Sequence, residues 1–406
     1  MRKPLRLDLW KWLAVALSAA LGALIFAALL GRPQSDIAIH TLWAGQATLA
    51  DWKSFIRQAA HPLWRICVFV LMQTGLSANG SALLFTALCK GLETWALVVL
   101  ARRLIGRGGW EAALCGLVAS VVASVWVPWV NPAVFLGGGS PNPWHSPTQI
   151  ALMAPMIVSV SWLAMAQERY TLSRETVSRR DSLLIAALLL ASALIKPSFL
   201  QAFLPAAGLY YLVRWIRDPK GSRYYLRLLL VAAPAVLAIV LEFLFYFGGV
   251  VEGQGGMTVL VSGEKTLAVL RLVLLSQLFP LFALAAFGNR ETLRQPLFSL
   301  TLLLDAVAIV QMLVLSETGY RAQDGNFGWA VMGASLMLWA VTLPLYWYRA
   351  SAWVKRLRAA AEGAPHVVSH PRAERAKIVA GAALLLWHLA SGIGYCVYLL
   401  ASQNAL

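Results

Sequence analysis

The chain has 406 residues, of which 59% are hydrophobic and 13% are charged, and its mean hydropathy is +0.68. Soluble domains carry about 25% charged residues, so this composition excludes an ordinary soluble protein and indicates a polytopic membrane protein. A net charge of +16 would suggest a nucleic-acid partner for a soluble chain, so the location of the charges decides whether one is needed.

Mostly apolar stretches of about 17 to 25 residues are long enough to cross a bilayer as helices. The sequence predicts an all-α, polytopic integral membrane protein with about 11 transmembrane helices in a single transmembrane domain over residues 1–406. The fifth and sixth stretches are separated only by Lys196 and Pro197, so one broken or re-entrant unit is the alternative there. The expected spans lie near 10–31, 80–104, 110–130, 148–167, 182–196, 198–214, 225–247, 267–287, 297–316, 328–347 and 378–401.

The basic residues indicate the orientation of these spans. With the N-terminus in the cytoplasm, 25 of the 34 Lys and Arg residues and 9 of the 18 acidic residues fall in cytoplasmic segments. The difference of 16 equals the net charge, so the positive-inside rule explains the excess and no nucleic-acid partner is expected. We therefore predict an inner-membrane protein with an extracytoplasmic working face. The expected external loops are 32–79, 131–147, 248–266 and 316–328, and the long cytoplasmic loop is 348–377.

Asp36 and His40 follow the first expected span and lie four residues apart, so on a helix they share one face. This arrangement suits a general base, Asp36, with a neighbouring histidine that holds or tunes it. A helix cap and an interfacial histidine are the alternative.

Residues 61–75 are apolar but too short to span, so we predict an extracytoplasmic helix along the outer interface. Trp64 and Arg65 are expected to point toward the lipid headgroups. Arg65 and a protonated His61 are candidate phosphate ligands, because both donate charge-assisted hydrogen bonds. Simple anchoring at the interface is the alternative, and it is the favoured interpretation of Trp64.

The loop NPAVFLGGGSPNPWHSPTQ lies between the third and fourth expected spans. Its glycines at 137–139 permit close backbone approach to a ligand, and its prolines stiffen the remainder. Asn142, Trp144 and His145 are candidate substrate-binding residues between those prolines. An N-cap or a loop-packing role is the alternative for His145.

Lys196 interrupts an apolar stretch at its external end, directly before Pro197. Such a lysine either extends to water or meets an anion, and a donor phosphate is one such anion. Both interpretations stay open.

The last external loop, SETGYRAQDGNFGWA, contains Arg321, Asp324 and Asn326. Arginine suits bidentate binding of phosphate, whereas a carboxylate and an amide suit sugar hydroxyls. Arg321 and Asp324 could instead pair with each other. The Gly-rich loop at 248–266 has few side chains that could bind or react with a substrate. It is interpreted as a mobile loop that could act as a lid.

Charged residues within the spans are costly and usually face a bundle interior. Lys90 and Glu93 lie three residues apart, which predicts a structural ion pair. A structural role is also favoured for Glu242, Asp305 and His388. The four cysteines show no paired spacing, so neither a disulfide nor a metal site is inferred from them.

The first quarter of the chain resembles membrane glycosyltransferases of the GT-C superfamily. The resemblance rests on Asp36 after the first span, the His-Pro-Leu-Trp segment at 61–64, a Gly-containing turn, and a span that closes with ARRLIG at 101–106. Together with NPWHSPT and KPSF, the sequence also resembles bacterial membrane proteins associated with surface-polysaccharide synthesis.

This resemblance implies a hexosyl- or pentosyltransferase that uses a polyprenyl-phosphate-linked sugar, with membrane lipids around it and an extracytoplasmic glycan or lipid as acceptor. It implies Asp36 as the catalytic base or as a metal-associated acid, and the base is the preferred role. The chain has this single acid where many relatives have an adjacent acidic pair, so no cofactor is certain and a divalent cation stays open. The alternatives are a transporter or flippase of polyprenyl-linked glycans, and a noncatalytic subunit of a polysaccharide machine.

Overall fold

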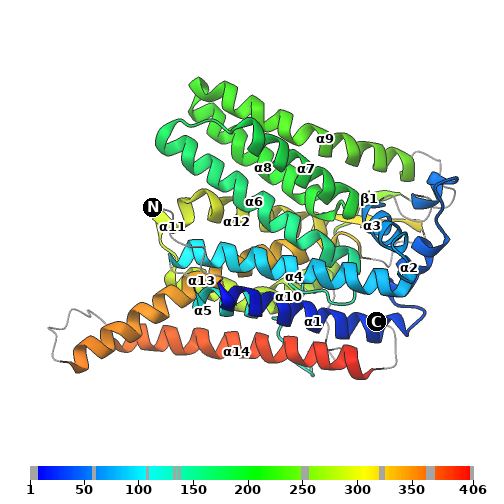
Figure 1. Ribbon diagram of the computed structural model, residues 1–406. Helices are drawn as coiled ribbons and strands as arrows, with labels where there is room; N and C mark the ends of the chain where they lie inside the picture. The colour runs from blue at the N-terminus through cyan, green and yellow to red at the C-terminus, as the bar shows by residue number, and fades with distance from the viewer. Residues whose placement is uncertain are drawn as a thin grey trace, which may run out of the picture.

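The computed structural model describes residues 8–56, 61–106, 109–130, 134, 139–247, 256–319, 325–362 and 371–402. Over these residues the chain forms fourteen α-helices, two short 3-10 helices and one two-stranded sheet (Figure 1). The prediction of an all-α fold is therefore confirmed.

The first half of the chain contains α1 Leu9–Leu30, α2 Asp36–Gln46, η1 Trp52–Phe55, α3 Leu63–Met72, α4 Ala78–Ile105, α5 Trp110–Ala119, α6 Pro147–Ser173 and α7 Arg179–Ile195. The second half contains α8 Ser198–Arg217, η2 Pro219–Gly221, α9 Ser222–Phe247, β1 Met257–Val259, α10 Gly263–Phe287, α11 Arg290–Arg294, α12 Pro296–Val314, β2 Leu315–Glu317, α13 Gly328–Ala361 and α14 Pro371–Ala401.

Eight helices of the described chain are long and apolar enough to cross a bilayer, which makes this a multi-pass membrane protein. They are α1, α4, α6, α9, α10, α12, α13 and α14. The structure thus supports eight spans where the sequence predicted about eleven. Two expected spans, 182–196 and 198–214, form separate helices α7 and α8, which fall outside this set.

The prediction of a membrane span at 110–130 is wrong, because only the first part of this segment is helical. Helix α5 ends at Ala119 after ten residues, and the Val-rich segment that follows is not helical. Its backbone bonds to other helices instead: Ala123 N–H donates to the His388 carbonyl at 3.3 Å, and Val125 N–H donates to the Leu275 carbonyl at 2.8 Å. Irregular backbone at membrane depth is tolerated where protein satisfies its polar groups in this way.

Helix α13 lies at the centre of the bundle. About 89% of its most apolar window is buried, compared with 17% for α9. It packs on α4, α8, α10 and α12, and Gly333 lets Met156 of α6 approach closely. Helix α9 is therefore the lipid-facing helix, and α13 the core.

The two ends of the bundle carry different elements (Figure 1). Helices α2 and α3 and the small sheet gather at one end, which we call the α2–α3 end. Helix α11, the last turns of α13 and the first turns of α14 lie at the opposite end. The expected external loops and the expected cytoplasmic loops are thus separated, while their assignment to the two sides of a membrane stays a prediction.

Cysteine labelling tests that assignment. In a Cys67→Ser background, Leu49→Cys at the α2–α3 end is expected to react with a membrane-impermeant maleimide in intact cells, because Leu49 is 78% exposed. Glu291→Cys on exposed α11 is expected to react only after the membrane is opened. Labelling of Glu291→Cys in intact cells would overturn the predicted orientation.

The expected interfacial helix exists as α3, but its orientation is corrected. Trp64 and Arg65 are 0% and 1% exposed, so they do not face lipid headgroups. The reason is packing: α3 lies against α2, α4 and α7, which buries one face, whereas Val70 on the other face is 57% exposed.

Two expected loops are also shorter than predicted. Helix α13 continues to Ala361 and α14 begins at Pro371, because the Ala-, Lys- and Arg-rich sequence between 348 and 361 favours helix. Residues 248–255 lie outside the described residues. After them, β1 pairs with β2 in antiparallel register, with Met257 opposite Glu317, so this part of the expected mobile loop is held in a sheet.

Candidate functional site

Local capping determines where Asp36 and His40 lie. Ser35 caps α2: its hydroxyl accepts a hydrogen bond from Ala38 N–H at 3.3 Å and donates to the Leu29 carbonyl at 2.7 Å. Asp36 is consequently the first residue of the helix, where the helix dipole favours a negative charge. His40 follows one turn later, so both lie on one face of α2 as predicted.

Four of the predicted site residues from three separate segments come close enough to interact electrostatically. The charges of Asp36 and Lys196 act on both His40 and His145. Asp36 and His40 come from α2, His145 precedes α6, and Lys196 joins α7 to α8. We call Asp36, His40, His145 and Lys196 the acid–histidine cluster.

Both histidines of the cluster are neutral at pH 7. Burial lowers the pKa of His40 to about 4; Asp36 opposes this shift, and Arg65 and Lys196 add to it. Burial likewise lowers the pKa of His145 to about 4, against Asp36 and with Lys196. The two imidazoles can therefore donate and accept hydrogen bonds, but they do not supply positive charge.

Aromatic rings and a third histidine surround His40. Its ring centroid lies 5.2 Å from that of Trp43, 5.9 Å from that of Trp64 and 6.4 Å from that of His61. The His40 Nδ1 atom is buried and has no hydrogen-bond partner among the described residues. A buried polar atom without a partner is costly, so this nitrogen is available to hydrogen-bond a ligand.

Helices α13 and α14 complete the other side of the cluster. His145 Nδ1 lies 2.8 Å from the Tyr395 hydroxyl of α14, and its ring centroid is 5.6 Å from that of Trp329 on α13. The Lys196 ammonium lies 3.3 Å from the centroid of the same Trp329 ring, a cation–π contact. Sequence reasoning missed Tyr395, because nothing in an apolar final span marks one tyrosine as a partner of a distant histidine.

The two ionisable residues of the cluster other than the histidines are Asp36 and Lys196, and neither side chain is occupied by a hydrogen bond within the described residues. Among the residues that the structure describes, none donates a hydrogen bond to the Asp36 carboxylate, and none accepts one from the Lys196 ammonium. A proton acceptor and an amine thus stand near each other with their hydrogen-bonding capacity free. Burial lowers the pKa of Lys196 to about 7, against the charge of Asp36, so a phosphate beside this amine would favour its charged form.

A buried polar network lies around Asn142 and Trp144. The Lys90 ammonium donates to Glu93 Oε1 at 2.7 Å and to Asn142 Oδ1 at 3.0 Å, and it lies 4.1 Å from the Trp144 ring centroid. Asn142 in turn donates to the carbonyls of Ala119 and Val122, both at 2.8 Å. The predicted Lys90–Glu93 ion pair is confirmed. Asn142 and Trp144, 1% and 0% exposed, position the loop that carries His145.

The remaining predicted ligands lie in different places. His61 is half-buried beside His40, and the Arg65 guanidinium is 5.8 Å from the Trp43 ring centroid. Arg321 and Asp324 lie outside the described residues. Asn326 donates to Glu317 Oε2 at 2.7 Å, next to the small sheet.

Asp305 and His388, deeper in the bundle, have structural surroundings, whereas a structural role for the half-buried Glu242 stays a prediction. Asp305 accepts a hydrogen bond from Gln277 at 2.7 Å, and His388 lies 2.7 Å from the Ala123 carbonyl through Nδ1. Neither carboxylate oxygen of Glu242 has a hydrogen-bond partner within the described part of the chain. These residues do not contribute to the acid–histidine cluster.

The resemblance leaves a divalent cation open, but the described residues contain no ready set of ligands for one. Over the described residues, no group of three or more His, Cys, Asp or Glu side chains could hold a metal ion. Asp36 is the one acid that acts on the cluster histidines. We therefore derive no step through a metal.

Comparison with known proteins shows similarity of fold. No family model matches the sequence, and no curated protein matches it. Among solved structures, the crystal structure of ArnT from Cupriavidus metallidurans in the apo state matches with a TM-score of 0.54 and 17% sequence identity. The match covers 97% of this chain and 77% of the ArnT chain. The chain thus shares the ArnT fold over nearly its whole length.

Proposed function

We propose that this protein is a membrane glycosyltransferase that transfers a sugar from a polyprenyl-phosphate donor to an extracytoplasmic glycan or lipid acceptor. The observation that carries the proposal is the Asp36 carboxylate, which no described residue engages, beside the Lys196 ammonium and two neutral histidines. The fold supports it, because ArnT belongs to the polyprenyl-phosphate-sugar-dependent GT-C enzymes that the sequence also resembles.

The chemistry assigned to the cluster is a single displacement with inversion. Asp36 removes the proton of the acceptor hydroxyl, whose oxygen then forms a bond to the anomeric carbon of the sugar. The bond from that carbon to the phosphate oxygen breaks, and the polyprenyl phosphate leaves with the electron pair. Lys196 stabilises the charge that develops on this phosphate.

The other predicted residues take supporting roles in this proposal. Neutral His40 and His145 hydrogen-bond sugar hydroxyls, and the free Nδ1 of His40 is available for this. His61 and Arg65 border the same site, and Arg321, Asp324 and Asn326 are proposed to close it from the loop before α13. Direct substrate contact by Asn142 and Trp144 stays a prediction, and their burial favours the positioning role.

Lys196→Ala is expected to weaken donor binding about tenfold or more, because a charged hydrogen bond to the leaving phosphate is lost in the ground state and in the transition state. Binding of a nonhydrolysable donor analogue to purified protein would measure this.

Two matched variants control the Lys196→Ala experiment. Lys196→Arg keeps the charge and is expected to keep most of the affinity, and Lys53→Ala removes an exposed lysine near the same end without effect. Unchanged donor affinity in Lys196→Ala would remove this lysine from the site. Movement of donor across liposomes by wild-type protein without cleavage would instead favour the flippase.

A further inference from the structure

A pocket of about 400 Å³ lies between α6 and α9, at the end of the bundle opposite the acid–histidine cluster. Three basic side chains line it, Arg174, Lys220 and Arg223, together with the aromatic rings of Tyr170 and Tyr224. Nothing in the proposed transfer reaction uses these residues.

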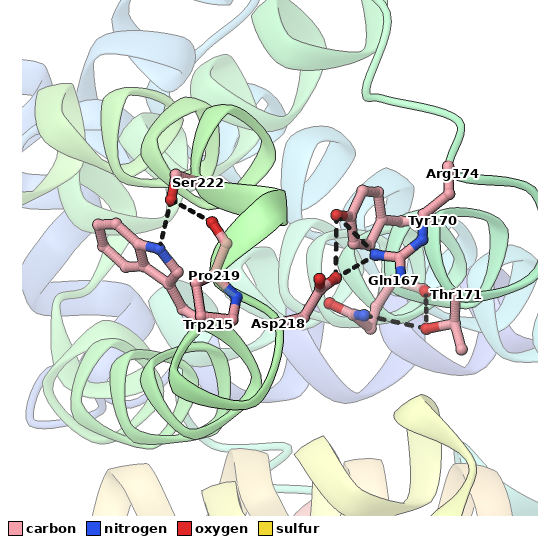
Figure 2. A network of polar contacts seen from close by, with 8 residues as sticks. All are labelled: Gln167, Tyr170, Thr171, Arg174, Trp215, Asp218, Pro219 and Ser222. Atoms are coloured by element: carbon pink, nitrogen blue, oxygen red, sulfur yellow. Dashed lines mark hydrogen bonds and ion pairs between the residues drawn. The ribbon is translucent and has the colours of Figure 1, made fainter.

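The first of these cations is held in place by a polar network, which Figure 2 shows. Arg174 follows α6 with a φ of 57°, the left-handed conformation that a residue with a side chain adopts at a cost. Its guanidinium pairs with Asp218 and donates to the Tyr170 hydroxyl at 2.9 Å. Tyr170 in turn donates to Asp218 at 3.1 Å. The hydrogen bond from Arg174 holds the pKa of Asp218 below its usual range, so this pair is neutral overall.

The turn that carries the other two cations is also fixed. Trp215 Nε1 donates to the Ser222 hydroxyl at 2.9 Å, and Ser222 donates to the Pro219 carbonyl at 2.6 Å (Figure 2). Gly221 lies against the Tyr170 hydroxyl so closely that a Cβ there would clash. Lys220 lies in this turn and Arg223 follows it, and both line the pocket.

Neither of these two cations forms an ion pair among the described residues, although the charge of Lys220 helps to lower the pKa of Asp218. Both side chains are exposed, and no salt bridge joins either of them to another described residue. Since Asp218 is already paired with Arg174, the pocket keeps a positive charge of about two. The stacked rings of Tyr170 and Tyr224, with centroids 4.1 Å apart, form a rigid wall beside it.

An apolar strip runs from the pocket along the lipid-facing helix α9. Leu226, Leu229 and Leu230 follow Arg223 within two turns and are 47%, 57% and 73% exposed. Only 17% of the apolar window of α9 is buried by the protein. A basic pocket at the end of membrane helices, continued by an exposed apolar strip, matches the shape of a phospholipid.

We propose that this pocket binds a phosphate group, supplied by the headgroup of an anionic membrane lipid whose acyl chains lie along α9. Lys220 and Arg223 bind the phosphate oxygens by charge-assisted hydrogen bonds. Tyr170 and Tyr224 border the glycerol portion at the level of the interface.

Native mass spectrometry of the purified full-length protein tests the proposal, with phosphatidylglycerol and phosphatidylcholine as competing probes. Wild-type protein is expected to retain phosphatidylglycerol preferentially. The double variant Lys220→Ala/Arg223→Ala is expected to lose that retention by roughly tenfold, because two of the charges that attract the headgroup are removed. Both residues are exposed, so the fold should survive, and size-exclusion chromatography checks this.

Two matched variants complete the design. Arg217→Ala/Arg227→Ala removes the same charge from neighbouring positions that do not line the pocket, and it is expected to retain the lipid. Lys220→Arg/Arg223→Lys keeps the charge and should retain it as well. Wild-type retention in Lys220→Ala/Arg223→Ala, or an equal loss in the Arg217/Arg227 control, would overturn the proposal. Displacement of the lipid by millimolar glycerol 3-phosphate would overturn the lipid assignment in favour of soluble phosphates.

Discussion

Asp36→Asn is expected to lower the rate of sugar transfer by about a hundredfold or more, because removal of a general base typically costs this much. The substitution preserves the shape of the side chain but removes the proton acceptor. Donor binding should stay near the wild-type value, because a base acts chiefly in the transition state whereas phosphate ligands act in the ground state as well. Release of polyprenyl phosphate from a labelled donor measures the rate.

The control is Asp51→Asn. Asp51 lies in the same segment between α1 and α3, but its charge is not among those that act on His40 or His145. This variant should transfer sugar at the parent rate. If purified Asp36→Asn protein also did so, Asp36 would not be the catalytic base.

The second large effect concerns the buried ion pair of α4. Lys90→Met is expected to lower the free energy of unfolding by about 3–5 kcal/mol, because the buried carboxylate of Glu93 is left without its partner. Glu93 Oε2 already has no hydrogen-bond partner among the described residues, so no second donor compensates. Unfolding by SDS titration in mixed micelles measures the loss.

The matched variant is Lys90→Met/Glu93→Leu, which removes both charges together. It is expected to recover most of the stability, because replacement of a whole buried pair by apolar residues is often neutral. A double variant as unstable as Lys90→Met would mean that the bond from Lys90 to Asn142, and not the ion pair, stabilises this part of the bundle.

Hydropathy predicted most of the long helices to within a few residues. The expected spans 10–31 and 80–104 correspond to α1 at Leu9–Leu30 and α4 at Ala78–Ile105. The same signal failed at 110–130, because hydropathy reports that a segment is apolar but not where its backbone hydrogen bonds go. Residues 123 and 125 find their partners on α14 and α10. That choice depends on tertiary packing, which no local pattern records.

The candidate site was predictable where its residues are neighbours in sequence or carry an unusual charge. The spacing of Asp36 and His40 was visible on one helix face, and Lys196 stood out at a break between two apolar stretches. The pairing of His145 with Tyr395 could not be predicted from the sequence, because 250 residues separate the two. Arg65 was assigned to the interface from its apolar segment, and only the packing of α3 against three helices shows that it is buried.

A cryo-electron microscopy map of the protein in lipid nanodiscs with a nonhydrolysable polyprenyl-phosphate sugar tests the central claim most directly. We expect the donor phosphate within hydrogen-bond distance of the Lys196 ammonium, with the sugar between Asp36 and the two histidines, at the α2–α3 end of the bundle. A donor whose phosphate instead occupies the basic pocket beside Arg174 at the opposite end, with no density near Asp36, would contradict the account.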